Sequence, residues 1–370
     1  MPLFDLAPKD SPDALFGRQQ EFSELTRLVK AGRWVVVLGP RMVGKTSLVK
    51  AVRTRLRLPG AYVNLWGVRS VHGLVEGLIS GLNESASLRA RLVRAARRVD
   101  GITAGPAGLA LSAPRPPFKT AWDLLDLLGT ENRGCLVVLD EIQELSANAG
   151  GLLKLLGNVF NTRPNIVFVF TGSLVGLSRT LLEPSTASPL YGRAPVPLQL
   201  GPFDRVTSSD FLTQGAAEAK VQLSPEQVAT ALAGPLDGTP GWLTLFGNHV
   251  AVRRLSPDRA LKETIREGKK AAEAELSRFL VGRETSLYWP VLKVIASRAG
   301  WTTIRESMER SDGKTVNDGT VQRVVRALEA NFLVRQVDSA YEVVDPMVRT
   351  YILDAGRPPR ARGDTADSAA

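Results

Sequence analysis

The 370-residue chain has very few of the side chains that build disulfides and zinc sites. It contains one cysteine, Cys135, and two histidines, His72 and His249. A single cysteine forms no disulfide framework, and it leaves too few thiolates for a cysteine-based metal cluster. A zinc site made of several histidines is not expected either. This shortage is typical of a protein from a reducing compartment, and we expect a cytoplasmic location.

Long apolar runs are also missing. The longest, residues 34–38 and 166–170, are far shorter than the ~20 residues that a membrane-spanning helix needs. The first 13 residues contain no apolar stretch of the kind that a secretory signal carries. We therefore expect neither a membrane segment nor an export signal.

Acidic residues are outnumbered by basic ones. The chain has 47 Lys and Arg against 37 Asp and Glu, a formal net charge of +10, and 44% of its residues are hydrophobic. The positive excess favours an acidic partner, either nucleic acid or the phosphates of a nucleotide. A chain of this length and apolar content has enough residues for two or three globular domains.

Strand-like and helix-like patterns alternate over residues 15–202. The strand-like runs lie at 34–38, 61–65, 136–139, 166–171 and 196–200. Most of them are nearly all apolar, as parallel strands buried on both faces are. Helical patterns lie between or beside them at 45–56, 120–128, 152–160 and 174–181. This alternation predicts an α/β domain with a parallel sheet flanked by helices.

The strand pattern stops after residue 203. Helical patterns at 203–213, 225–233, 241–252 and 257–280 predict a small helical lid over 203–282. Three further helices at 289–299, 302–310 and 315–332 precede two short strands at 333–337 and 341–344, an order that resembles a winged-helix domain over 283–354. Pro290 falls in the expected first turn of its helix. The last residues, 355–370, predict a disordered tail.

One strongly basic segment interrupts the first domain. Residues 88–119 contain a single acid, Asp100, against seven basic residues: Arg89, Arg91, Arg94, Arg97, Arg98, Arg115 and Lys119. We interpret the segment as an insertion at the edge of the domain, helical in its first half and a loop in its second. Its charge suits either a solvated surface or an acidic partner.

A glycine-rich sequence follows the first apolar strand. Residues 39–46 match G-x-x-x-x-G-K-[ST] between a strand and a helix, the context in which such a loop binds phosphate. The backbone N–H groups and the helix N-terminus would hold phosphate oxygens, Lys45 would contact the β- and γ-phosphates, and Thr46 would bind Mg²⁺. The predicted nucleotide-binding residues here are Gly39, Pro40, Arg41, Met42, Val43, Gly44, Lys45, Thr46 and Ser47. A chance glycine-rich turn is the alternative.

Polar side chains follow two of the apolar strands. Asp140 and Glu141 end the strand at 136–139, so Asp140 would hold Mg²⁺ and Glu141 would polarise the attacking water. The alternative is that both acids cap the next helix. Thr171 and Ser173 follow the strand at 166–170, where a polar residue would sense the γ-phosphate; the alternative is an N-cap for the helix at 174–181.

Taken in order, six short motifs resemble the archaeal ATPase family, in the STAND branch of AAA-like P-loop NTPases. The resemblance covers about residues 15–351. Besides the phosphate loop, the motifs are Phe16-Gly-Arg18-Gln-Gln-Glu21, Leu139-Asp-Glu-Ile-Gln143, Thr171-Gly-Ser173, Pro189-Leu-Tyr-Gly192-Arg193 and Gly238-Thr-Pro240-Gly-Trp242. The ordered set is specific, whereas each motif outside the phosphate loop is weak alone.

The resemblance implies further site residues. Gly17, Arg18 and Pro240 would flank the adenine and ribose, and Pro240 would report the nucleotide state. Arg193 would approach the γ-phosphate in the same molecule or from a neighbouring subunit; the alternative is a surface arginine. Trp242 is expected to pack in the core of the lid. The lid has no clear second-sensor arginine, which argues against a stable hexameric ring and leaves a monomer or a nucleotide-dependent oligomer.

The partner of the C-terminal domain stays open between DNA and protein. The helix at 315–332 carries Gln322, Arg323 and Arg326 opposite its apolar face, which suits a helix in a major groove. The same helix carries Asp318 and Glu329, and a winged helix can equally dock protein.

The sequence as a whole predicts a cytoplasmic ATPase that binds ATP or ADP with Mg²⁺ and hydrolyses ATP slowly. Its nucleotide state would be coupled to the winged helix, with double-stranded DNA as a candidate partner of that domain or of the basic insertion. The alternatives are a non-catalytic, nucleotide-gated DNA-binding regulator and a protein-docking scaffold.

Overall fold

The computed structural model describes residues 2–96, 102–105, 108–111, 116–131, 133–172, 177–236 and 238–359. The chain forms two compact units. We call residues 8–39 and 45–200 the sheet unit, and residues 2–7, 40–44 and those from 201 onward the helical unit. Among the described residues, no helix combines the length and apolarity that crossing a bilayer requires.

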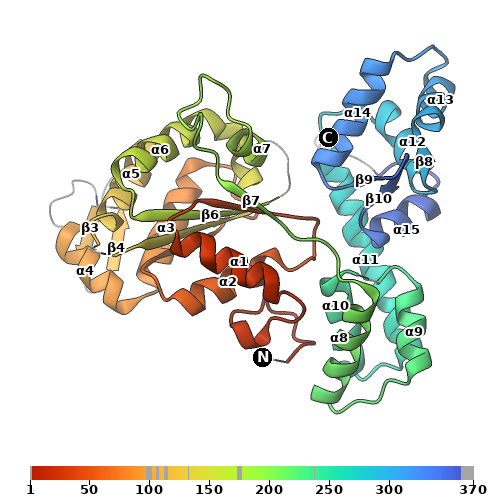
Figure 1. Cartoon of the computed structure of the whole chain (residues 1–370), viewed down its shortest axis with the longest axis horizontal. Coiled ribbons are helices and arrows are strands. Elements are labelled where there is room, and N and C mark those ends of the chain that lie inside the picture. The colour runs from red at the N-terminus through yellow and green to blue at the C-terminus, as the bar shows by residue number, and fades with distance from the viewer. Residues whose placement is uncertain are drawn as a thin grey trace, which may run out of the picture. The chain divides into compact units, whose positions relative to one another are not determined.

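The sheet unit is built on a five-stranded parallel sheet in the order β2–β5–β6–β1–β7 (Figure 1). The strands are β1 (Val35–Leu38), β2 (Gly60–Asn64), β5 (Cys135–Asp140), β6 (Ile166–Gly172) and β7 (Val196–Gln199). Every residue of β1, β5 and β6 is buried, which explains their unbroken apolar sequences. The predicted α/β domain with a parallel sheet is confirmed.

Helices cover both faces of this sheet. Figure 1 shows α5 (Pro117–Leu128) and α6 (Ala149–Thr162) on one side, and α1 (Gln19–Lys30) and α2 (Lys45–Leu56) on the other. The unit also contains α3 (Val71–Asn83), α4 (Ala86–Ala96), α7 (Leu177–Leu182) and the 3₁₀ turns η1 (Pro12–Ala14) and η2 (Ile142–Asn148). The parallel strands all end at one edge of the sheet, so side chains that follow different strands meet there.

The basic insertion differs from its prediction in the second half. Its first half forms α4 as expected, but β3 (Ile102–Gly105) and β4 (Gly108–Leu111) pair as an antiparallel hairpin where we predicted a loop. The Gly- and Ala-rich sequence carries little β propensity, so the hairpin gave no sequence signal. Arg91 is neutralised by Glu131, with the guanidinium nitrogen 2.8 Å from the carboxylate oxygen. Arg97, Arg98, Asp100 and Arg115 lie outside the described residues.

The helical unit begins with α8 (Arg205–Glu218), α9 (Pro225–Ala233), α10 (Pro240–Ala251) and α11 (Pro257–Leu280), as predicted. Side-chain caps fix two of the helix starts: Asp204 accepts the Thr207 N–H, and Ser224 with Gln227 forms a capping box. The N-terminal residues 2–7 belong to this unit. Phe4 is 3% exposed, and it occupies space that a Cβ on Gly215 of α8 or Gly247 of α10 would fill.

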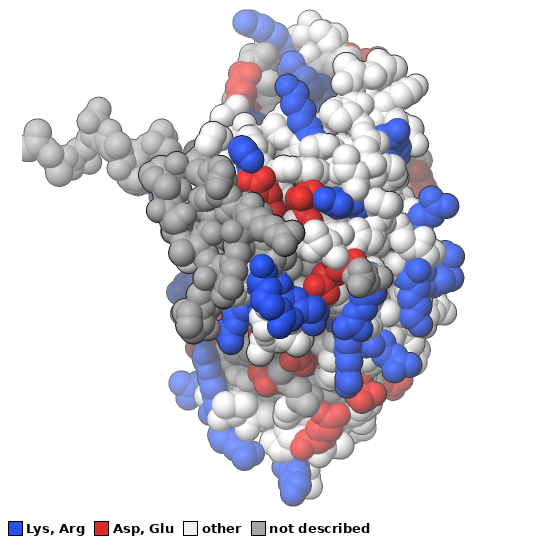
Figure 2. All heavy atoms as spheres, turned by 90° about the vertical axis from the view of Figure 1, so that its left-hand side faces the viewer, with Lys and Arg blue, Asp and Glu red and all other residues white. Residues whose placement is uncertain are grey.

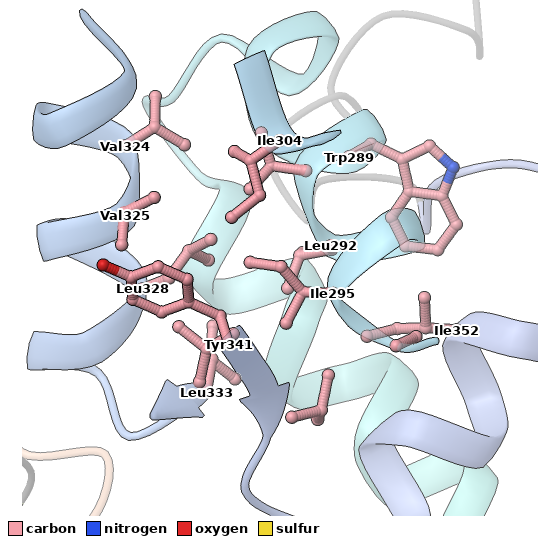
Figure 3. Packing of buried hydrophobic residues seen from close by; sticks show 14 of the residues in the cluster. Trp289, Leu292, Ile295, Ile304, Val324, Val325, Leu328, Leu333, Tyr341 and Ile352 are labelled. Carbon is pink, nitrogen blue, oxygen red and sulfur yellow. The ribbon is translucent and has the colours of Figure 1, made fainter. Parts of the chain in front are cut away.

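The C-terminal part of this unit has its own apolar core. It contains α12 (Thr285–Ile295), β8 (Ala299–Gly300), α13 (Trp301–Asp312), α14 (Asp318–Ala330), β9 (Val334–Val337), β10 (Ala340–Val343) and α15 (Pro346–Asp354). The strands form an antiparallel sheet in the order β8–β10–β9. Figure 3 shows side chains of α12, α13, α14, β10 and α15 converging on this core. The three helices and the hairpin match the prediction, whereas β8 and α15 had not been predicted.

Pro290 lies farther inside its helix than expected, because α12 begins at Thr285. Proline lacks the N–H that would bond the carbonyl four residues earlier. The Ser311 hydroxyl donates to that carbonyl, on Ser286, at 3.4 Å. The tertiary contact therefore replaces part of what the helix loses. The predicted boundaries at residues 282 and 354 stay predictions.

Candidate functional site

The phosphate loop runs from the end of β1 to the start of α2. The backbone has positive φ at Gly39 (154°), Met42 (66°) and Gly44 (98°). Glycine adopts such angles without the steric cost that a side chain adds, so the two glycines let the loop curl tightly. The Lys45 ammonium donates to the Gly39 carbonyl at 2.8 Å and is buried. The loop thus curls around the side chain of Lys45, the lysine of the motif that is expected to contact phosphate.

Asp140 lies at the carboxyl end of β5, where three hydroxyl groups converge on its carboxylate. The Thr46 hydroxyl of α2 donates to Asp140 Oδ2 at 2.9 Å. The Thr171 hydroxyl donates to Oδ1, and the Tyr62 hydroxyl donates to Oδ2. Asp140 is 2% exposed. We call Thr46, Tyr62, Asp140 and Thr171 the Asp140 cluster; it joins residues from α2 and three strands.

Glu141 directly follows Asp140 in the sequence. Its own backbone is strained, with a φ of 61° in the left-handed region. Its N–H donates to Thr171 Oγ1 at 3.0 Å, and its carboxylate accepts from Gln143 Nε2. Glu141 precedes η2 without a side-chain capping bond, so the alternative in which it caps the next helix is not observed. Thr171 is the sixth residue of β6, while α7 begins only at Leu177, so Thr171 does not cap that helix either. Ser173 lies outside the described residues.

Tyr62 was missed at the sequence level. Its hydroxyl reaches Asp140 because β2 and β5 are neighbours in the sheet, with Tyr62 opposite Val138. Burial, followed by the negative charge of Asp140, raises the pKa of the phenol well above its usual value, so it stays a hydrogen-bond donor. A polar tyrosine inside the strand pattern at 61–65 was the available signal. It became meaningful only once the strand order was known.

Comparisons with known proteins agree with this geometry. The sequence model of a family described as an ATPase domain predominantly from Archaea matches residues 15–246, more than half of the chain. The chain belongs to this family. It is an AAA-like P-loop ATPase that binds nucleotide. No curated protein sequence matches the chain.

Two solved structures similar to this ATPase come from archaea. The Walker-type ATPase PABY2304 of Pyrococcus abyssi is 27% identical, with a TM-score of 0.75 over 95% of this chain and 99% of that one. The ORC2 protein of Aeropyrum pernix, in its ADPNP–ADP complexes, is 17% identical, with a TM-score of 0.64 over 95% of both chains. At that identity the second likeness concerns the fold.

The oxygen atoms of the Asp140 cluster suit Mg²⁺ in this ATPase. Mg²⁺ is held by one or two protein oxygen ligands, with water and substrate phosphates completing its shell. Asp140 and the adjacent Thr46 hydroxyl provide such a set. Among the described residues, no group of three or more His, Cys, Asp and Glu side chains could form an all-protein metal site. The residues present therefore fit a phosphate-bound cation.

Gly17 and Arg18 lie just before α1. Gly17 has φ of 61°, and the Arg18 guanidinium pairs with Glu21 at 2.9 Å while being 6% exposed. Burial lowers the pKa of Arg18, and Glu21 opposes that effect. The structure thus shows a buried Arg18 paired with a half-buried Glu21; the predicted contact of Arg18 with adenine or ribose stays a prediction.

Pro240 is the first residue of α10, and its neighbour Gly241 makes close contact with the phosphate loop. The Gly241 N–H donates to the Met42 carbonyl at 2.9 Å. A Cβ on Gly241 would come within 2.7 Å of Met42 Cβ, so only glycine fits. Trp242 is buried, and its indole N–H lies 3.4 Å from Asp345 Oδ1. Trp242 packs in the core as expected, and the reporting role of Pro240 stays a prediction.

Arg193 lies at the edge of the sheet opposite the Asp140 cluster. Its guanidinium donates to Asn161 and stacks 5.3 Å from the ring centroid of Phe160, both at the end of α6. β7 begins three residues after Arg193, and the Val196 N–H donates to the Trp34 carbonyl ahead of β1. Arg193 therefore lies near the ends at which the parallel strands begin, and the Asp140 cluster lies where they end. A whole strand, which rises about 3.3 Å per residue, separates the two. The structure therefore does not bring Arg193 to the cluster of its own molecule.

Proposed function

We propose that this ATPase is a STAND-type switch that binds ATP or ADP with Mg²⁺ at the Asp140 cluster and hydrolyses ATP slowly. The observation that carries the proposal is the convergence of Thr46, Asp140 and Thr171 directly beside the phosphate loop. Three segments far apart in the sequence supply these oxygen atoms, which a chance glycine-rich turn would not bring together.

Each residue of the site has a proposed role. The N–H groups of residues 39–47 and the Lys45 ammonium bind the phosphates, so Lys45 exchanges the Gly39 carbonyl for phosphate oxygens. Thr46 and Asp140 hold Mg²⁺, which when bound neutralises the charge that develops on the phosphates. Thr171 and Ser173 sense the γ-phosphate. Gly17, Arg18 and Pro240 flank the adenine and ribose.

Glu141 is the proposed general base. Its carboxylate must orient and polarise a water molecule for attack on the γ-phosphate. In the structure one of its oxygens accepts from Gln143 instead, which leaves the base less available. This contact supports slow hydrolysis by the protein in the absence of a partner.

Arg193 is proposed to act on nucleotide bound to a neighbouring copy of the chain. The exposed Arg193 lies at the opposite edge of the sheet, where it is accessible to another molecule. An arginine that approaches the γ-phosphate from outside stabilises the charge of the transition state. This arrangement requires a nucleotide-dependent oligomer, in keeping with the absence of a second-sensor arginine.

The C-terminal part of the helical unit is proposed to be a winged helix that follows nucleotide state. The order α12–β8–α13–α14–β9–β10 supports this assignment. On α14, Gln322, Arg323 and Arg326 are exposed, which suits contact with double-stranded DNA.

Protein docking is the second candidate role of this module, because arginines in and beside the β9–β10 hairpin are paired with carboxylates. Arg335 pairs with Glu342 at 2.6 Å, and Arg298 pairs with Asp338 at 3.2 Å. The carboxylates beside these arginines lower the local positive charge and so weaken its attraction for DNA phosphates. On the sheet unit, Figure 2 shows Lys and Arg side chains interspersed with acidic ones on the face that includes the insertion. This mixture likewise suits either partner.

ATP turnover, measured with and without duplex DNA at low salt, tests the proposal. We expect slow turnover that disappears with EDTA. Stimulation by DNA supports the DNA-coupled switch, and turnover that DNA does not change supports protein docking. Nucleotide binding without any turnover would leave the non-catalytic, nucleotide-gated regulator.

A further inference from the structure

Tyr62 is the member of the Asp140 cluster to which the phosphate-binding motifs assign no role. It lies on β2, directly beside β5, and pairs in register with Val138. Side chains two residues apart on a strand point to the same face, so Val138 and Asp140 share the face to which Tyr62 belongs. A tyrosine is long enough to reach the diagonal neighbour. Its hydroxyl meets Asp140 Oδ2 at the edge where the strands end.

Both oxygens of the Asp140 carboxylate accept hydrogen bonds from hydroxyl groups. An ionised carboxylate offers about four lone-pair positions for hydrogen bonds. Thr171 occupies one on Oδ1, while Thr46 and Tyr62 both donate to Oδ2. With these three donors in place the carboxylate has a single preferred orientation and one position left for the metal shell. Thr46 is itself a proposed Mg²⁺ ligand, whereas Tyr62 donates to the same Oδ2 and has no proposed role as a ligand.

We propose that Tyr62 is a positioning residue for Mg²⁺: its hydroxyl fixes Asp140 in the orientation that the metal requires. Groups that orient a metal-binding carboxylate tune metal affinity although they do not touch the metal. This inference rests on the proposed nucleotide site and adds a residue to it.

The surroundings of Tyr62 keep its hydroxyl in place as a donor. Lys50 lies one helical turn after Thr46 on α2, and its ammonium is 5.0 Å from the centroid of the Tyr62 ring. A cation over an aromatic face attracts the ring and holds it. The first turns of α2 therefore set both partners of Asp140 Oδ2: Thr46 directly, and Tyr62 through Lys50.

The test is a Mg²⁺ titration of nucleotide binding by the full chain, using a fluorescent ADP analogue. Tyr62→Phe removes the donor and keeps the ring beside Lys50. We expect its affinity for the nucleotide in EDTA to equal that of the wild type, while the Mg²⁺ concentration that half-saturates the metal-dependent change rises about tenfold. Tyr341→Phe, which removes a hydroxyl from the C-terminal core, is the matched control and should leave both quantities unchanged.

Three results would overturn the inference, and they are distinguishable. An unchanged or lower Mg²⁺ midpoint in Tyr62→Phe would show that the hydroxyl does not position Asp140, with the nucleotide site intact. Equal losses of affinity in EDTA and in Mg²⁺ would show a purely structural role. Absence of nucleotide binding by the wild type would overturn the proposed function together with the inference. Tyr62→Leu, which removes ring and hydroxyl, should raise the midpoint at least as much as Tyr62→Phe.

Discussion

At the scale of single residues, truncation of Lys45 should weaken nucleotide binding through the loss of one contact to phosphate. Lys45→Ala removes a charge-assisted contact to phosphate worth about 1.5–3 kcal/mol, or roughly 10- to 100-fold in affinity. Lys154→Ala, on an exposed position of α6, removes the same charge far from the loop sequence and should have no effect. Calorimetric titration with ATP measures both. Equal affinities for wild type and Lys45→Ala would sink the assignment of the loop.

The residues of the site differ in how far sequence alone could predict them. Thr46 and Asp140 belong to motifs with fixed positions at the ends of strands, so their contact followed from the parallel sheet. Tyr62 could not be predicted, because its role depends on which strand lies beside β5. For Arg193 the family resemblance implied an approach to the γ-phosphate in the same molecule or from a neighbouring subunit. The fold places the loop before β7 at the other edge of the sheet, and the role on a neighbouring copy stays a proposal.

At the scale of elements, Phe4 anchors the N-terminal residues 2–7 between α8 and α10. Its ring stands edge-on to Phe211 with centroids 6.0 Å apart, and its carbonyl accepts from Asn248 at 3.0 Å. Phe4→Ala should destabilise the helical unit by about 3–5 kcal/mol, the usual cost of emptying a buried phenylalanine site. Leu6→Ala, at a side chain 54% exposed, is the control. Urea unfolding measures both; similar midpoints for the two variants would mean that Phe4 contributes no packing.

His249 on α10 should make the stability of the helical unit depend on pH. It is fully buried, and burial lowers its pKa, while Glu267, 3.8 Å away across α10–α11, opposes the shift. Glu263 also opposes the shift, whereas Arg253 and Arg266 add to it. The folded state prefers the neutral imidazole. The contribution of His249 to the free energy of unfolding is therefore fully present above the unfolded pKa of about 6.5, and it is lost progressively as the pH falls below that value.

His249→Leu should remove the part of the acid-induced loss of stability that comes from protonation of His249. Urea midpoints at pH 8 and pH 5.5 measure it, and His72→Leu, at an exposed position on α3, is the matched control. We expect the difference between the two pH values to be smaller for His249→Leu than for the wild type or the control. Identical differences in all three proteins would show that His249 does not control the pH response.

Element boundaries were predicted best where periodicity and caps agree. The helix Pro225–Ala233 has the bounds that we predicted, and the capping box of Ser224 and Gln227 fixes its start; the helix expected at 315–332 is observed at Asp318–Ala330. The hairpin β3–β4 and the two-residue β8 lack such signals. Their short strands are stabilised by pairing with another strand, which no local pattern encodes.

At the scale of the whole molecule, two basic surfaces are candidates for contact with DNA phosphates: α14 and the basic insertion. If the chain binds duplex DNA through α14, neutralising Arg323 and Arg326 together should reduce the slope of log K against log salt by about one unit for each phosphate that the protein no longer neutralises. Arg94→Ala tests the insertion in the same way. Fluorescence anisotropy over a salt series, with duplex DNA, compares both variants with the wild type. Equal slopes in all three would remove both surfaces from a DNA interface and favour protein docking.

The central claim is that the chain hydrolyses ATP through Glu141 at a site that binds nucleotide independently of it. Glu141→Gln keeps the size and hydrogen bonding of the side chain but removes the base, and Glu144→Gln is the matched control in η2. ATP affinity and Mg²⁺-dependent turnover, measured on the same samples, decide the matter. We predict wild-type affinity with turnover reduced about 100-fold or more for Glu141→Gln, and wild-type values for Glu144→Gln. Turnover that survives in Glu141→Gln would contradict the account.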